Sequence, residues 1–207
     1  MQIERIDGYD DRRFPREVLL EHGAFLIDGC DPCSFRIRDD HSATVSFGDY
    51  ARVEPIIEEF RFYAEHITVF FDDAGNRIAE YPPVVTREMP LCEIQPSQFY
   101  ADEDKVAAVA TFLRSGEDVI VPVAYDKSID RFVSLDGHTR MFTAHAQGWT
   151  SVRVFETQTD EYIFEFAHEA RRRGVYGVGD IALLPHAQYR VKWDRFCDDF
   201  FASRDRV

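Results

Sequence analysis

Three strand-like segments and two helix-like segments alternate between residues 103 and 156, and their order limits the possible folds more than any other feature of the chain. VIVPVAYD (119–126), RFVSL (131–135) and SVRVFE (151–156) are rich in the β-branched and aromatic residues that favour strands. Apolar residues at helical spacing predict one helix before the first strand and another, from about 138 to 147, between the last two. The order helix, strand, turn, strand, helix, strand indicates an α/β or α+β domain.

Residues 1–86 predict a small α/β subdomain. Strand-like segments lie at 24–28, 33–38 and 43–47, and a helix is expected from about Glu54, where apolar residues recur at three- and four-residue steps. TVFFDD and RIAEYP flank the turn-rich residues Ala-Gly-Asn and predict a hairpin or an exposed bend. The prolines of YPPVVTREMP impede both a helix and a central strand, so we place a domain boundary there.

A domain at 87–157 and a C-terminal helical extension at 158–207 follow that boundary. The first helix of the domain carries an apolar stripe as far as Leu113, and we expect it to end before Gly116. The extension is expected to contain a helix at about 160–173 and a terminal helix near 186–202. These two helices are predicted to brace the preceding domain.

The charge balance argues against a nucleic-acid partner. The chain of 207 residues has 38 acidic and 24 basic side chains, which gives a formal net charge of -14. Proteins that bind DNA through its phosphates need a basic face, which this balance opposes. The first residues lack the apolar run of a signal peptide, and no apolar run approaches the ~20 residues that span a bilayer. We therefore expect a cytoplasmic protein without a membrane partner.

The four cysteines predict reduced thiols, because the chain shows no secretory signal. Cys30 and Cys33 have the spacing of a redox pair or of half a zinc site. A redox pair usually opens a helix, whereas the residues from Cys33 onward are strand-like, and no second pair with this spacing follows. We predict no metal site from these residues.

The segment SLDGHTR, where a predicted strand becomes a helix, combines residue types that suit anion binding. The first N–H groups of a helix have no intrahelical partners, and the helix dipole adds partial positive charge there. Asp136 is placed to cap the helix, and Gly137 lets the backbone approach a ligand closely. Thr139 offers a hydroxyl, Arg140 a bidentate guanidinium, and His138 either a hydrogen-bond donor or a general acid or base.

A purely structural interpretation of the same residues stays open. Asp136 would then be an ordinary helix cap, Gly137 a tight-turn residue, and Arg140 the partner of a nearby acid. Such a five-residue pattern is short, so its surroundings decide between the two interpretations.

Those surroundings resemble the ParB/sulfiredoxin superfamily over residues 91–156. The resemblance rests on IQPSQFY before a helix, on the strand VIVPVAYD, and on RFVSLDGHTRMFTAHAQGWTSVRVFE, which looks like the family's strand, DGHHR-type phosphate motif, helix and following edge strand. It implies a ParB/sulfiredoxin-like domain with a small mixed sheet and helices. It also implies that ATP or a related nucleotide binds with Mg²⁺, its phosphates held by Gly137, His138, Thr139 and Arg140.

The DGHHR branch includes free L-serine kinases, from whose motif DGHTR differs by one residue, Thr139. The resemblance thus implies phosphoryl transfer to a small hydroxylated metabolite such as a free amino acid. A glutamate acts as the base in those kinases, and its place here is taken by Gln98, whose amide cannot accept a proton. Asp136, Glu93 or Glu156 is then expected to supply the carboxylate, beside His138 in the catalytic set.

Two alternatives belong to other functional classes. A non-catalytic nucleotide sensor or assembly module needs the same phosphate site but no base, which suits Gln98. A ParB-like DNA-binding protein or nuclease needs a basic groove, which the acidic charge opposes. Sulfiredoxin chemistry is not expected, because His138 stands where that branch has its reactive cysteine.

Overall fold

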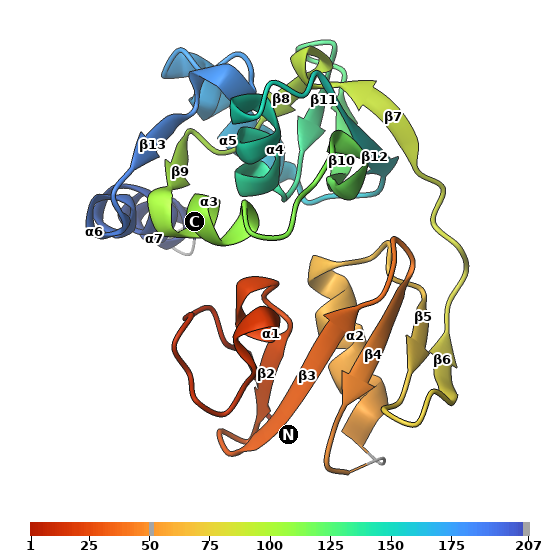
Figure 1. The fold of residues 1–207 in the computed structure, drawn as a ribbon. Helices are drawn as coiled ribbons and strands as arrows, with labels where there is room; N and C mark the ends of the chain where they lie inside the picture. Colours follow the sequence, from red (N-terminus) through yellow and green to blue (C-terminus); the bar gives the residue numbers. More distant parts are fainter. Residues whose placement is uncertain (50–51, 205–207) are drawn as a thin grey trace. The chain divides into compact units, whose positions relative to one another are not determined.

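The computed structural model describes residues 1–49 and 52–204, which form two compact units, Met1–Val85 and Thr86–Val207 (Figure 1). The division falls within the segment YPPVVTREMP. Each unit combines helices with a β-sheet of its own, which confirms the α+β class. The residues of the C-terminal extension lie in the second unit together with the motif SLDGHTR.

The sheet of the first unit has six strands in the order in which they follow in the chain. Neighbouring strands are antiparallel, except for the parallel pair β4 and β5. The α/β character expected here is thus confined to one crossover, the connection from β4 to β5 through α2, because every other pair of neighbouring strands is antiparallel. The elements are β1 (Ile3–Arg5), α1 (Arg16–Leu20), β2 (Ala24–Ile27), β3 (Asp31–Ile37), β4 (Ser42–Ser46), α2 (Val53–Tyr63), β5 (Val69–Phe71) and β6 (Arg77–Glu80).

Strand β2 is buried on both faces, because a helix covers each of them. Phe25 and Ile27 belong to the hydrophobic core that contains the apolar face of α2. Ala24 and Leu26 point the other way and pack in a smaller core with Val18 of α1. This two-sided burial explains why AFLI is apolar at every position.

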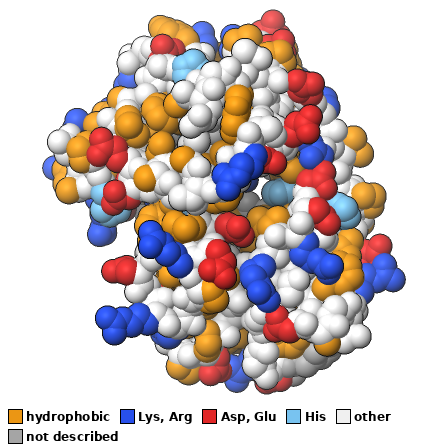
Figure 2. All heavy atoms as spheres, viewed as in Figure 1, with side chains coloured by type: hydrophobic (Ala, Val, Ile, Leu, Met, Phe, Trp, Pro, Cys, Tyr) orange, Lys and Arg blue, Asp and Glu red, His pale blue; other side chains and the backbone are white. Residues whose placement is uncertain are grey.

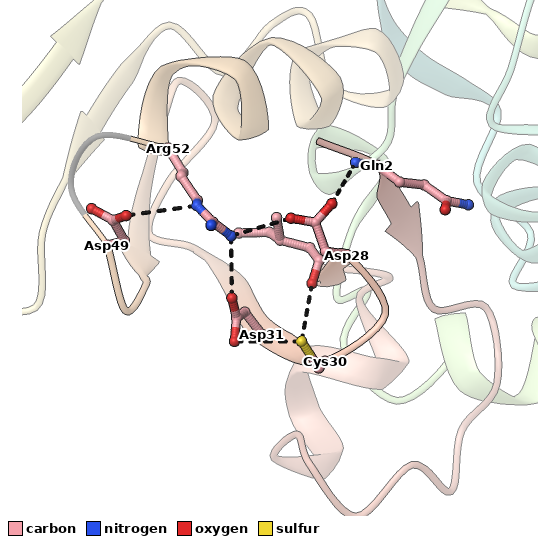
Figure 3. A network of polar contacts seen from close by, with 7 residues as sticks. Gln2, Asp28, Cys30, Asp31, Asp49 and Arg52 are labelled. Atoms are coloured by element: carbon pink, nitrogen blue, oxygen red, sulfur yellow. Dashed lines mark hydrogen bonds and ion pairs between the residues drawn. The ribbon is translucent and has the colours of Figure 1, made fainter.

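Arg52, at the start of α2, holds the turn between β2 and β3 (Figure 3). Its Nη1 lies 3.3 Å from Oδ2 of Asp28 and 3.2 Å from Oδ2 of Asp31, and its Nε lies 3.6 Å from Oδ2 of Asp49. All four side chains are at least 38% exposed to solvent, so each ion pair contributes little to stability. The network fixes the direction of a turn in which Asp28 has a positive φ.

The cysteines of this turn do not form a redox pair at a helix start. Cys30 is exposed, and Cys33 is buried in β3. Burial raises the pKa of the Cys33 thiol to about 12, which keeps it protonated and unreactive. Cys92 and Cys197 are also free thiols.

The second unit is built on a five-stranded mixed sheet with the order β7-β12-β10-β11-β8. The pairs β12–β10 and β11–β8 are parallel, whereas β7–β12 and β10–β11 are antiparallel. A separate parallel pair joins β9 to β13. The strands are β7 (Arg87–Pro90), β8 (Ile94–Pro96), β9 (Tyr100–Asp102), β10 (Ile120–Asp126), β11 (Arg131–Ser134), β12 (Ser151–Glu156) and β13 (Ala182–Leu184).

Helices pack on this sheet around one hydrophobic core. Val121 and Val123 of β10 share that core with Met141 and Ala144 of α4. The α-helices are α3 (Glu103–Val109), α4 (His138–Ala146), α5 (Glu161–Arg172), α6 (His186–Tyr189) and α7 (Arg195–Arg204). Short 3₁₀ helices lie at η2 (Leu91–Glu93), η3 (Gly116–Asp118) and η4 (Val178–Asp180), and a π-helical stretch, η5, at Arg190–Asp194.

Two helices differ from their expected extents. The helix α3 ends at Val109 rather than near Gly116, and the hydroxyl of Thr111 bonds the carbonyl oxygen of Ala108 at 2.6 Å, where the chain turns. Leu113 nevertheless stays buried. The terminal helix is interrupted by η5, a wide turn beyond which α7 begins.

The C-terminal segment packs against the core through aromatic rings. The ring centroid of Phe99 lies 5.0 Å from that of Trp193 and 5.0 Å from that of Phe196, both in edge-to-face geometry. The guanidinium of Arg173 lies over the ring of Phe99 at 4.3 Å. These contacts connect the end of the chain to the loop that follows β8.

The described surface mixes both signs of charge. On the face drawn in Figure 2, Lys and Arg side chains alternate with Asp and Glu and with apolar side chains. Within the described part of the chain, no helix has the length and the apolar character that crossing a membrane requires.

Candidate functional site

The segment SLDGHTR lies where β11 passes into α4, beside the end of β8. Strands β8 and β11 are parallel, and Pro96 is level with Ser134. Their carboxyl ends therefore meet at the same edge of the sheet. This pairing brings Ser97, the first residue after β8, next to the start of α4.

Gly137 occupies the N-cap position of α4 with φ +77° and ψ +15°. This left-handed conformation strongly favours glycine. A β-carbon here would lie 3.3 Å from Cγ2 of Val121, so the backbone passes close to β10. The expectation that Asp136 caps the helix was wrong, because the cap lies one residue later, and the Gly137 cap has no side-chain hydrogen bond.

Arg140 turns back toward Asp136 across the first turn of α4. Its Nη2 lies 3.6 Å from Oδ2 of Asp136. The Arg140 side chain is 23% exposed and that of Asp136 is 59% exposed, so solvent reaches the pair. Arg140 therefore has the acidic partner that the structural interpretation of the motif expects. The carbonyl oxygen of Thr139, in the same turn, accepts a hydrogen bond from the hydroxyl of Thr143 at 2.8 Å.

His138 points into the protein rather than toward solvent, and 7% of it is exposed. Its Nε2 lies 3.0 Å from Oγ of Ser97, 3.0 Å from Oγ of Ser134 and 3.2 Å from the main-chain nitrogen of Ser97. Burial lowers the pKa of His138 to about 4, and the charge of Arg140 acts in the same direction, against that of Asp136. The imidazole is therefore neutral at neutral pH.

The other expected catalytic residues lie apart from this turn or are engaged elsewhere. Gln98 is partly buried, and its Nε2 donates to the carbonyl oxygen of Tyr100 at 2.7 Å and to the hydroxyl of Tyr189 at 2.8 Å. Glu93 is exposed and directly precedes β8, at the opposite end of that strand from the turn. Glu156 ends β12, two strands away from β11, and pairs with Arg87 at 2.8 Å. Asp136 is the one expected carboxylate that the fold places at the turn.

Ser97 and Ser134 are site residues that the sequence motif did not reveal. Both are buried, with 3% and 0% of their surfaces exposed. Ser97 Oγ donates to the carbonyl oxygen of Ser134 at 2.7 Å. The sequence carried a weak signal for Ser134, which lies four residues before His138 at the end of a strand. The approach of Ser97 to His138 depends on the pairing of β8 with β11, which a local motif does not show.

Two groups of potential metal ligands occur among the described residues, and neither includes a residue of SLDGHTR. Asp39, Asp40 and His41 are exposed between β3 and β4, and Asp102, Asp104 and His186 lie near the start of α3. Within each group the ligand atoms lie within 4.8 Å of one another.

Asp102 already has partners that explain the second of these groups. It caps α3 by accepting from the main-chain nitrogen of Asp104 at 3.0 Å, and its other oxygen lies 2.7 Å from Nδ1 of His186. The group thus consists of a helix cap and a side-chain contact that connect α3 to α6.

No protein-family model matches the chain, and no curated protein matches its sequence. Among solved structures, the crystal structure of protein Atu1540 from Agrobacterium tumefaciens is similar to part of the chain. The match has a TM-score of 0.36 and 15% sequence identity, and it covers 47% of this chain. The chain spans 61% of the length of that structure.

Proposed function

We propose that the turn between β11 and α4 binds the phosphate groups of a nucleotide, ATP or a related one, together with Mg²⁺. The observation that carries the proposal is the left-handed Gly137 at the N-cap of a nine-residue helix, with Arg140 beside it. The absence of a β-carbon lets the guanidinium of Arg140 lie close to the backbone of Gly137, and the helix dipole favours negative charge at this end. The resemblance of residues 91–156 to the ParB/sulfiredoxin superfamily supports the same assignment.

The donors at this turn suit a chain of phosphates. The main-chain N–H groups of the first helical turn point away from the helix body and have no intrahelical carbonyl partners. The long, half-exposed ion pair of Arg140 with Asp136 is weak, so phosphate can replace it with a charge-assisted, bidentate contact. Thr139 adds a hydroxyl. Mg²⁺ would enter on the nucleotide's own phosphate oxygens, as is usual for this ion.

The proposed reaction transfers a phosphoryl group to a small hydroxylated metabolite such as a free amino acid. The substrate hydroxyl oxygen forms a bond to the γ-phosphorus, the bond from that phosphorus to the bridging oxygen of ADP breaks, and the hydroxyl proton passes to Asp136. Such transfer depends chiefly on positioning and on neutralising phosphate charge, which the α4 terminus and Arg140 supply. Asp136 is exposed, so a second substrate has access to its carboxylate.

The test is a calorimetric titration of the full chain with ATP, ADP and CTP, each with Mg²⁺. We expect saturable binding of at least one of them. The nucleotide that binds is then incubated with free amino acids and small polyols, and new phosphomonoesters are sought by ³¹P NMR. If none of the three nucleotides binds, the proposal is wrong.

A non-catalytic nucleotide sensor is the second candidate, and the placement of Gln98 favours it. The amide of Gln98 is engaged by Tyr100 and Tyr189 and offers no base at the position expected for one. Under this alternative the titration still shows binding, but no phosphomonoester forms with any hydroxyl compound. The same two experiments therefore distinguish the candidates.

A further inference from the structure

A buried hydrogen-bond cluster, formed by His138, Ser97 and Ser134, underlies the proposed phosphate site. Nε2 of His138 has three polar neighbours within 3.2 Å, and all of them belong to the two serines. The three residues come from different segments: the end of β8, the end of β11 and the first turn of α4. The contacts together determine where the imidazole carries its proton.

The main-chain N–H of Ser97 determines which ring nitrogen of His138 carries the proton. A main-chain N–H can only donate, and its hydrogen points at Nε2 of His138 with N···N 3.2 Å. A hydrogen on Nε2 would collide with it, so Nε2 is unprotonated. The hydroxyl proton of Ser97 is already given to the carbonyl oxygen of Ser134 at 2.7 Å. The hydroxyl of Ser134 is therefore the second donor to Nε2, at 3.0 Å.

We infer that His138 is held as the neutral Nδ1–H tautomer and is a positioning residue, with Ser97 and Ser134 as the positioning residues that hold it. As a base, the ring would have to take a proton at Nε2, where Ser97 and Ser134 donate. As an acid, a neutral ring would have to lose its Nδ1 proton and become an imidazolate, which is inaccessible at neutral pH. His138 is therefore excluded from general acid–base chemistry, contrary to the role expected from the motif.

The cluster instead fixes the geometry of the turn. It ties the first residue of α4 to the ends of two parallel strands, so the left-handed Gly137 is held between anchored neighbours. Loosening His138 should displace the main-chain N–H groups that face the ligand. This effect on ligand binding rests on the proposed function, whereas the tautomer of the ring does not.

The tautomer is tested directly by NMR of the ligand-free full chain with ¹⁵N-labelled histidine. The chain has seven histidines, so the His138 signals are assigned by their loss in His138→Gln. We expect Nε2 to give a pyridine-type nitrogen signal and Nδ1 a pyrrole-type one, without change between about pH 6 and about pH 8. A protonated Nε2 in this range, or an even tautomer mixture, would overturn the inference whatever the protein binds.

The positioning role is tested with Ser134→Ala and a matched control, Ser42→Ala. Both serines are buried, with 0% and 3% exposed, but Ser42 lies in the first unit and bonds Asp39. We expect Ser134→Ala to shift the His138 ¹⁵N signals toward the mixed tautomer and to weaken Mg²⁺-nucleotide binding about tenfold or more. Ser42→Ala should do neither. Unchanged ring signals in a folded Ser134→Ala variant would contradict the role of this hydroxyl, and if that variant does not fold, the wild-type spectrum still decides the tautomer.

Discussion

The α-carbon of Gly137 lies so close to Val121 that an added β-carbon would approach Cγ2 of that side chain to 3.3 Å. At the other end of α4, Gly148 has nearly the same φ, +79° against +77°, but a β-carbon there would meet no atom within 4 Å. The two glycines thus form a matched pair. They share the left-handed backbone conformation and differ in their surroundings.

Alanine at either glycine should reduce the free energy of unfolding by about 1–2 kcal/mol, because both positions require the left-handed region. Only Gly137→Ala should also weaken Mg²⁺-nucleotide binding, since its methyl group would press against Val121 and against the guanidinium of Arg140 and so displace the proposed phosphate-binding side chain. Urea unfolding and calorimetric titration of both variants measure the two effects. Equal nucleotide affinities in the two variants would show that the ligand does not approach Gly137.

Asp136→Asn separates binding from transfer. The amide keeps the size of the side chain but cannot accept the substrate proton, so phosphoryl transfer should fall about a hundredfold or more. Nucleotide affinity should stay equal or rise, because a negative charge near the phosphates is removed. Initial rates of phosphomonoester formation and a parallel titration measure the two. Full activity in Asp136→Asn would remove Asp136 from its proposed role as base.

The stability of the protein should depend on pH through His138. Burial lowers the pKa of His138 from 6.5 to about 4, so between these values the unfolded chain binds a proton that the folded chain does not. The contribution of His138 to stability is therefore complete above about pH 6.5 and is lost as the pH falls toward about 4. Urea unfolding at about pH 7.5 and about pH 5 should show a smaller loss for His138→Gln than for the wild type. An equal loss in both proteins would contradict the assignment.

Asp102 should matter more for folding than its neighbour Asp104. The Asp102 side chain is fully buried, caps α3 and contacts His186, so Asp102→Ala removes a cap and leaves a histidine without its partner. We expect it to lower the free energy of unfolding by about 2 kcal/mol. Asp104→Ala keeps the main-chain N–H that donates to the cap and should change stability by less than about 0.5 kcal/mol. Chemical denaturation measures the free energy of unfolding of both variants. Comparable losses in Asp102→Ala and Asp104→Ala would contradict the importance of the Asp102 cap.

Local signals predicted the elements around the site. The strand SVRVFE has the expected bounds, Ser151–Glu156, because β-branched residues and a glycine-terminated helix define it locally. Gly137 was correctly associated with a tight turn, although the cap was placed one residue too early. Asp is a common N-cap residue, and only the backbone dihedral angles show that Gly137 takes that position.

Contacts across the chain could not be predicted in the same way. Ser97 reaches His138 over 41 residues, through the parallel pairing of β8 with β11. Successive side chains in extended backbone point to opposite sides. The neighbouring residues Ser97 and Gln98 therefore face different parts of the protein, and the sequence does not show which of the two contacts the turn. The resemblance to the ParB/sulfiredoxin superfamily indicated Gln98 as the residue in the place of the kinase glutamate. In the structure, Ser97 contacts the imidazole of His138, and Gln98 donates to the hydroxyl of Tyr189.

The central claim is that phosphate binds at the start of α4, and a titration of Arg140→Ala with Mg²⁺-ATP tests it most directly. Arg172→Ala is the matched control, because Arg172 lies in the same unit on α5, is 69% exposed and pairs with Glu169. We expect saturable wild-type binding that weakens about ten- to a hundredfold in Arg140→Ala, as loss of a charge-assisted hydrogen bond predicts, and that is unchanged in Arg172→Ala. Equal affinity in all three proteins, or no saturable binding by the wild type, would contradict the account.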